Sequence, residues 1–243
     1  MNASSFRVMT NADGQAILAN LAVVETLRQR RRDDRAFDLQ MHELKLFQHR
    51  RFELSYADLL ADPGQQEAAR FFLEELYGPH DFSDRDAQFA RIVPALVRLF
   101  PSEIVATVRM LSDLHTLSEQ LDAIMADSAP KAAYTNTTYA AVWRQTGRES
   151  DRQLQIDWMV QIGHALLRYT GNPLLRHSLR MMRGPARAAG LAALQHFLER
   201  GFETFRRLHE PGVFLALIAG RERSIARWLF ENPPGTPAPP GFV

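Results

Sequence analysis

Apolar residues recur every three to four positions along nearly the whole chain, from about Gly14 to Phe230. This spacing places them along one side of an α-helix, which has about 3.6 residues per turn. Alternating apolar and polar runs bounded by turns, which are typical of β-strands, are missing. The pattern therefore predicts an all-α fold, a bundle-like array of about nine to ten amphipathic helices with short connections.

Turn and capping residues divide this pattern into separate helices. Asp13 is expected to cap the first helix, Ser83 with Asp86 resembles a capping box, and Ser150 is expected to cap a later helix. Pro94 lies inside an apolar pattern and is expected to kink or divide that helix. The expected helices cover 14 to the charged run at 28–35, then about 37–60, 65–77, 84–100, 102–127, 139–145, 151–169, 173–182, 185–208 and 212–230.

The length of the chain suits one large domain or two small ones. Its 243 residues, 46% hydrophobic and 23% charged, have the composition of a globular protein with a substantial core. We predict a flexible N-terminus over 1–12, a single all-helical domain over 13–231, and a disordered Pro-rich tail over 232–243. The linker-like segment 128–138 is the place where this domain would subdivide.

Composition narrows the classes of function. The chain has no cysteine, which excludes disulfides, thiolate nucleophiles and cysteine-ligated metal sites. No apolar run approaches the roughly 18 residues of a membrane span, and no signal peptide is readable at the N-terminus. We therefore expect a cytoplasmic protein without membrane contact. A net charge of +1 gives no overall attraction to nucleic acid.

The segment FFLEELYGPHDF (71–82) places two glutamates within a run of aromatic and leucine residues. On a helical wheel the segment is apolar over most of its circumference, which is typical of a helix packed between neighbours. Glu75 lies between apolar positions and is expected to be partly buried, so it needs a cationic partner or a raised pKa. The expected partner is Arg50 or Arg51, and the alternative is acid–base chemistry. Glu74 is expected to face solvent.

The same residues carry a family resemblance. The stretch FFLEELYGPHDFSDRDAQFARIVPALVRLFP resembles the signature of a bacterial family of hypothetical proteins, the FFLEELY motif proteins, and 71–77 match that name letter for letter. The similarity extends through RRFELSYADLLADP upstream and PARAAGLAALQHFLERGFETF downstream, so it covers most of the chain. That family has no established activity, and the resemblance therefore implies no catalytic residues.

The helix expected at 151–169 carries a thin polar stripe on an otherwise apolar surface. The stripe has four, three and four residue spacings and falls within an arc of about 60°; it consists of Asp157, Gln161, His164 and Arg168. An ordinary surface helix has a wider polar face. The stripe is therefore expected to face either a narrow solvent slit or an internal cavity.

The helix expected at 102–127 has a similar stripe of His115, Ser118 and Asp122. If the two stripes faced each other, two histidines and two aspartates would meet in a helical core, as a pocket for a small polar ligand. If they did not, both would be solvated faces. The paired Glu-x-x-His motifs of di-iron bundles are missing, so no metal and no cofactor are predicted.

A basic segment follows, since no acidic residue occurs between Asp157 and Glu199. Its arginines have helical spacing, although Gly184-Pro185 interrupts the helix before the last of them; they are Arg176, Arg180, Arg183 and Arg187. One interpretation is a solvated face that pairs with acids from the first half of the chain. The other is a surface that binds an anion, a phosphate group or nucleic acid.

Motifs for nucleotide binding, serine hydrolysis or zinc proteolysis are missing from the sequence. The first hypothesis is therefore a non-enzymatic protein that binds an unknown protein partner or forms a homo-oligomer. The second is a helical protein with a buried polar pocket for a small ligand, with or without catalysis. Anion or nucleic-acid binding through 176–187 is the third.

Overall fold

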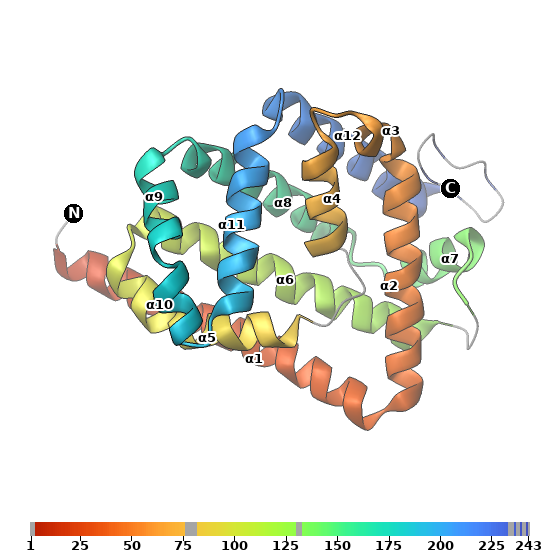
Figure 1. The fold of residues 1–243 in the computed structure, drawn as a ribbon. Coiled ribbons are helices and arrows are strands. Elements are labelled where there is room, and N and C mark those ends of the chain that lie inside the picture. The colour runs from red at the N-terminus through yellow and green to blue at the C-terminus, as the bar shows by residue number, and fades with distance from the viewer. Residues whose placement is uncertain are drawn as a thin grey trace.

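The periodic sequence folds into helices. The computed structural model describes residues 3–75, 82–129 and 133–232 and the single positions 236, 239 and 242, with side chains from residue 12 onward. This part of the chain contains twelve helices and no strand, which confirms the predicted all-α class (Figure 1). Their bounds are α1 (Ala3–Asp33), α2 (Arg35–Ser55), α3 (Ala57–Ala61), α4 (Gln66–Glu75), α5 (Ser83–Leu99), α6 (Ser102–Ser128), α7 (Asn136–Thr146), α8 (Glu149–Thr170), α9 (Pro173–Met181), α10 (Arg183–Ala188), α11 (Ala192–Arg207) and α12 (Pro211–Glu231).

The long helix α6 crosses the middle of the array (Figure 1). It contacts α1, α2, α5, α7 and α8, and α8 in turn contacts α9, α11 and α12. Because α6 has neighbours on several sides, it buries polar as well as apolar positions, including Ser112, Thr116 and Asp122. Polar side chains of α6 therefore lie inside the protein.

Two of the predicted helix starts are wrong at the N-terminal side of the fold. The first helix begins at Ala3, so Asp13 lies inside α1 instead of capping it, and its carboxylate accepts a hydrogen bond of 2.9 Å from Arg109 of α6. The helix α5 has Phe82 at its N-cap position, and Ser83 is already its first residue. In both places the acidic residue contacts an arginine of another helix instead of capping its own. Asp13 contacts Arg109 of α6, and Asp86 contacts Arg28 of α1.

A third predicted start is wrong at α8. Arg148 occupies the N-cap position in the left-handed region, with φ 63°, and Ser150 lies in the first turn. Gly147, with φ 62°, precedes it and ends α7 as predicted. Two consecutive residues with positive φ thus make the sharp turn between the two helices, since such values of φ stop a right-handed helix.

Two of the predicted helices are each divided into two. Tyr56 separates α2 from α3, and its fully buried side chain reaches toward α12. Gly190, with φ 69°, lies between α10 and α11, where a non-glycine residue would be strained. In contrast, α5 continues through Pro94 without division.

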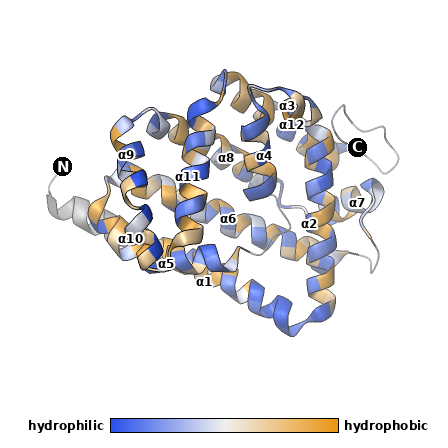
Figure 2. Cartoon of the chain, in the orientation of Figure 1, coloured by the Kyte–Doolittle hydropathy of each residue, from blue (hydrophilic) through white to orange (hydrophobic). Residues whose placement is uncertain are grey.

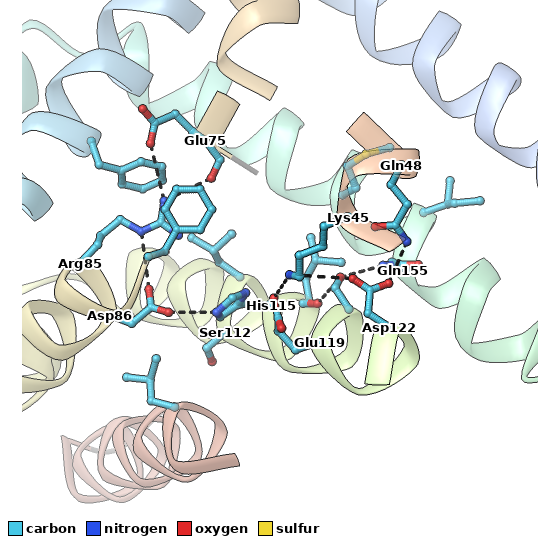
Figure 3. Close-up of a pocket in the computed structure, with 18 of the residues that line it drawn as sticks. Lys45, Gln48, Glu75, Arg85, Asp86, Ser112, His115, Glu119, Asp122 and Gln155 are labelled. Carbon is cyan, nitrogen blue, oxygen red and sulfur yellow. Dashed lines mark hydrogen bonds and ion pairs between the residues drawn. The ribbon is translucent and has the colours of Figure 1, made fainter. Parts of the chain in front are cut away.

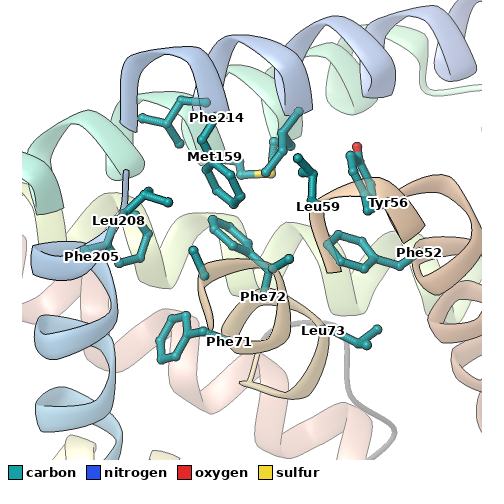
Figure 4. Packing of buried hydrophobic residues seen from close by; sticks show 14 of the residues in the cluster. Phe52, Tyr56, Leu59, Phe71, Phe72, Leu73, Met159, Phe205, Leu208 and Phe214 are labelled. Atoms are coloured by element: carbon teal, nitrogen blue, oxygen red, sulfur yellow. The ribbon is translucent and has the colours of Figure 1, made fainter. Parts of the chain in front are cut away.

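Phe71 and Phe72 of the FFLEELY segment lie within a large aromatic cluster (Figure 4). The ring of Phe71 stacks on Phe197 of α11, with centroids 5.7 Å apart, and meets Phe205 edge to face at 6.2 Å. Phe72 packs between Phe205 and Phe214, each 6.0 Å away. These contacts confirm that α4 is a packed element between neighbours. Its predicted end at Tyr77 lies outside the described residues.

Both sides of the segment 128–138 pack into one hydrophobic cluster, which joins Leu44 and Met125 to Tyr139 and Leu229. Phe242 of the Pro-rich tail belongs to the same cluster and lies against the rings of Tyr139 and Trp228. The other described tail positions are 236 and 239.

Hydrophilic residues are concentrated where α1 meets α2, at the charged run 28–35 (Figure 2). Asp34 caps α2 there by accepting hydrogen bonds from the backbone N–H groups of Ala36 and Phe37. None of the helices in the described ranges is long and apolar enough to cross a membrane.

Candidate functional site

A cavity of about 260 Å³ is lined by residues of α1, α2, α4, α5, α6, α7, α8, α11 and α12. Most of its wall is apolar, and this apolar surface includes Phe89, Leu111, Ile156, Met159, Phe197 and Ile225. Charged and amide side chains gather at two places on the wall (Figure 3). We name them the Asp86 cluster and the Lys45 cluster.

The Asp86 cluster consists of Arg28, Glu75, Arg85, Asp86 and His115. Asp86 Oδ2 accepts a hydrogen bond of 2.5 Å from Arg28 Nη2 and lies 3.0 Å from His115 Nε2. Its other oxygen lies 3.5 Å from Arg85 Nε, and Arg85 Nη1 lies 3.7 Å from Glu75 Oε2 (Figure 3). Burial of Asp86 favours the protonated form, but the contacts with His115 and Arg28 outweigh it and lower the pKa of Asp86 to about 2.

The Lys45 cluster consists of Lys45, Gln48, Glu119 and Asp122, with Ser118 and Gln155 beside them. Lys45 Nζ donates a hydrogen bond of 2.5 Å to Glu119 Oε1 and lies 4.0 Å from Asp122 Oδ2. Gln48 Nε2 donates to Asp122 Oδ1 at 2.8 Å, and Gln155 Nε2 donates to Ser118 Oγ at 2.7 Å.

The two carboxylates of the Lys45 cluster differ in the direction in which the protein moves their pKa. Burial opposes ionisation of Glu119, yet Lys45 at 2.5 Å lowers the pKa of that carboxyl group. Burial raises the pKa of Asp122, because its cationic neighbours are farther away and its one close hydrogen bond comes from a neutral amide. Glu119 is therefore a fixed counter-ion for Lys45, whereas Asp122 takes up a proton more readily than an aspartate in water.

A third polar group lies where α2 meets α12. Arg51, only 6% exposed, donates from Nη1 and Nη2 to the two carboxylate oxygens of Glu222 at 3.0 and 3.1 Å. Tyr56 Oη donates to Glu222 Oε1 at 2.7 Å. Burial opposes the charge of Arg51, but Glu222 and nearby tyrosines raise its pKa. Beyond this group, the guanidinium of Arg152 lies 3.9 Å above the ring of Trp143.

The two polar stripes predicted from the sequence do not face each other. His115, Ser118 and Asp122 line the cavity, whereas the stripe on α8 points away from it. Gln161, His164 and Arg168 are exposed, and Asp157 accepts hydrogen bonds from Gln153 and from Arg223 of α12. The physical reason is that α8 packs against α6, α11 and α12, so its thin polar stripe is the strip that remains at the surface.

Several cavity residues were missed from the sequence. On α8 the residues that line the cavity are Arg152, Gln155, Ile156 and Met159, a mixed face that resembles part of the core. One feature of the sequence could have drawn attention to Lys45: of the 29 lysine and arginine residues, only Lys45 and Lys131 are lysines. Its flanking Leu44 is fully buried, which places this unusual residue at the edge of the core.

The predicted ion pairs form with other partners. Glu75 pairs with Arg200 of α11 at 2.7 Å and with Arg85, not with Arg50 or Arg51. Glu74, expected in solvent, also pairs with Arg200 and is partly exposed. Arg51 turns instead toward α12, and Arg50 is exposed. Wheel positions identify the buried face of a helix, but they do not identify which helix packs on that face.

The basic segment lies on α9 and α10 at the surface. Two of its arginines pair with acids, and those acids belong to α11 rather than to the first half of the chain: Arg183 with Glu199 at 2.6 Å, and Arg176 with Glu203 at 3.8 Å. Arg180 and Arg187 are exposed and form no ion pair with a described residue. Anion binding at these four arginines stays a prediction.

Within the described ranges, no group of three or more His, Asp or Glu side chains is arranged to hold a metal ion. Comparison with protein families gives one match, over residues 27–236, to a family described as Domain of unknown function (DUF8198). Comparisons with curated proteins and with solved structures give no match.

Proposed function

The chain belongs to this domain family, and from the geometry of the cavity we propose that the protein binds a small, mostly apolar molecule inside the helical array. The observation that carries the proposal is a cavity of about 260 Å³ with a mainly apolar wall and polar groups at two separate places. Sites for small molecules usually have this composition, because the apolar wall supplies affinity and the few polar groups fix orientation.

The volume of the cavity limits the size of the ligand. An apolar cavity of about 150 Å³ accommodates benzene. A cavity of about 260 Å³ therefore accommodates a molecule of roughly ten non-hydrogen atoms by the same proportion. This size fits a single substituted ring or a short branched chain.

A polar atom at the wall supports binding over simple packing. Asp122 Oδ2, on a residue of the cavity wall, accepts no hydrogen bond from any described side chain. Polar atoms without partners inside a protein are uncommon, since each one costs stability. A bound molecule that donates a hydrogen bond would satisfy this oxygen.

We expect ethylbenzene to bind in the cavity and the variant Ala226→Leu to weaken that binding about tenfold or more. Ala226 lines the cavity, so three additional carbon atoms at this position occupy the space that the probe needs. The measurement is isothermal titration calorimetry of the full chain with ethylbenzene.

The matched control is Ala216→Leu on the same helix, because Ala216 is exposed and lies outside the cavity wall. Circular dichroism establishes that both variants remain helical. Equal affinity of ethylbenzene for the two variants would reject an internal site.

A second candidate function, binding of a protein partner, is favoured by the exposed surface of α9. Leu174, Met181 and Met182 are 75%, 66% and 51% exposed, although large apolar side chains gain from burial. Arg180 and Arg187 are exposed on the same basic segment. Self-association through this surface would bring arginines of two copies together, so we favour a partner protein with an acidic surface.

This second candidate predicts that the isolated protein is monomeric in solution. Multi-angle light scattering of the wild type and of Met181→Glu is expected to give one monomeric mass for both. A dimer in the wild type that disappears in Met181→Glu would show that a second copy, rather than an acidic partner, covers α9.

A further inference from the structure

In the Lys45 cluster, the ammonium group of Lys45 and the carboxylate of Asp122 are far enough apart for one oxygen atom of a ligand to bridge them. Lys45 Nζ and Asp122 Oδ2 are 4.0 Å apart, which is too long for a direct hydrogen bond. Each group has an unused capacity. The ammonium group has three N–H donors, one of which bonds to Glu119, and Asp122 Oδ2 has no donor among the described residues.

An oxygen atom about 2.8 Å from both Lys45 Nζ and Asp122 Oδ2 would make two hydrogen bonds of ordinary length. That oxygen must accept from the ammonium group and donate to the carboxylate. A hydroxyl group does both, whereas a carboxylate only accepts and an ammonium group only donates. Both groups lie on the cavity wall, within reach of a ligand (Figure 3).

We infer that the ligand of this cavity is a small apolar alcohol whose hydroxyl group bridges Lys45 and Asp122. This inference rests on the proposed function, because it requires that a molecule enters the cavity. It adds the chemical class of that molecule and the two residues that select it.

The charge balance of the wall favours a neutral ligand. Its other carboxylates have cationic partners: Glu75 and Asp86 contact Arg85, Glu119 contacts Lys45, and Glu222 contacts Arg51. A charged ligand would add an ion to a set of charges that are mostly paired already, and the loss of its hydration would be poorly compensated. A neutral hydroxyl group avoids this cost. The raised pKa of Asp122 agrees, since burial already disfavours additional charge at this point.

The apolar part of such a ligand would extend along the apolar wall of the same cavity. Ile156 and Met159 of α8 and Ile225 of α12 line the same cavity. One six-membered ring with a one-carbon arm and a hydroxyl group has about eight non-hydrogen atoms, which fits within the limit of roughly ten set by the volume. Benzyl alcohol is therefore a suitable probe.

The test compares four probes of nearly equal size on the full-length wild-type protein by isothermal titration calorimetry at pH 7. Benzyl alcohol carries a hydroxyl group, benzylamine a cation, benzoate an anion, and ethylbenzene no polar group. We expect benzyl alcohol to bind about tenfold tighter than each of the others, since hydrogen bonds to charged groups contribute more than neutral ones.

The variant Asp122→Asn identifies the residue responsible. Gln48 keeps the amide oxygen in the place of Oδ1, so an NH₂ group replaces Oδ2 and cannot accept from the hydroxyl group. The preference for benzyl alcohol over ethylbenzene is expected to fall to about twofold or less, with the affinity for ethylbenzene retained. Asp127→Asn is the matched control, because Asp127 is exposed on the same helix and pairs with Arg30.

The outcomes separate the inference from the proposed function. If ethylbenzene binds as tightly as benzyl alcohol, the hydroxyl bridge is wrong and the apolar cavity site stands. If benzylamine or benzoate binds most tightly, the ligand is charged and the inference is overturned. If none of the four probes binds the wild type, both the inference and the proposed function fail.

Discussion

Replacing Glu222 with alanine is expected to lower the free energy of unfolding by about 3–5 kcal/mol, because it leaves a buried arginine without its counter-ion. Arg51 is 6% exposed and bonds through both terminal nitrogens to the two oxygens of Glu222. Tyr56 Oη would also lose its acceptor. Urea denaturation of the wild type and the variant, with a linear extrapolation to water, measures the difference.

Substitutions at neighbouring positions separate this effect from general damage to α2. Arg51→Met is expected to destabilise the protein by a similar amount, since Glu222 is then left without its cation. Arg50→Met, the exposed neighbour, should change stability by less than about 0.5 kcal/mol. The double variant Arg51→Met with Glu222→Ala should lose less stability than the sum of the two single losses. Additive losses in the double variant would mean that the two residues do not act as a pair.

The fold class could be predicted from the sequence because helical periodicity is a local property. The boundaries that were wrong depend on distant contacts. Tyr56 ends α2 while its hydroxyl group bonds to a glutamate 166 positions away. Asp13 looked like a cap, but α1 extends beyond it and its carboxylate contacts Arg109 of α6. Local sequence cannot distinguish an acid that caps a helix from one that contacts another helix.

Only one of the two polar stripes that were expected to form the site lies at the cavity. The stripe with His115, Ser118 and Asp122 does line the cavity, because other helices cover this side of α6. The stripe on α8 was expected beside it and lies at the surface instead. A thin polar stripe is compatible with either place. The choice depends on the order of packing, which residue spacing does not encode.

The glutamates of the FFLEELY segment illustrate the same limit. The partial burial of Glu75 followed from the wheel, but its partner did not. Arg200 of α11 lies 125 residues away from Glu75 in the sequence and contacts both glutamates. The expected partners are nearer in the sequence, but Arg51 pairs with Glu222 and Arg50 is exposed. The segment thus acts as a packing element whose acidic edge attaches α4 to α11.

Lowering the pH from about 4 to about 2 is expected to remove about 2 kcal/mol of stability through Asp86 alone. Its carboxyl group has a folded-state pKa of about 2 against a usual value of 3.8, and every tenfold difference in proton affinity between the folded and unfolded states corresponds to about 1.4 kcal/mol. Because the pKa is lowered on folding, the stabilisation is fully present above the unfolded-state value. It is lost as the pH falls through the folded-state value, when the group becomes protonated in the native protein as well.

The variant Asp86→Asn is expected to remove this part of the pH dependence of stability, because asparagine does not ionise. At neutral pH we expect a loss of about 3 kcal/mol, since Arg28 at 2.5 Å and Arg85 at 3.5 Å lose a buried counter-ion. Below the folded-state pKa, where Asp86 itself is neutral, the variant and the wild type should converge in stability. Asp84→Asn is the matched control, because Asp84 is exposed in the same turn of α5. The free energy of unfolding of both proteins is measured by urea denaturation from pH 7 to pH 2. If the difference between Asp86→Asn and the wild type stays constant over this range, the aspartate stabilises the fold by its shape rather than by its charge.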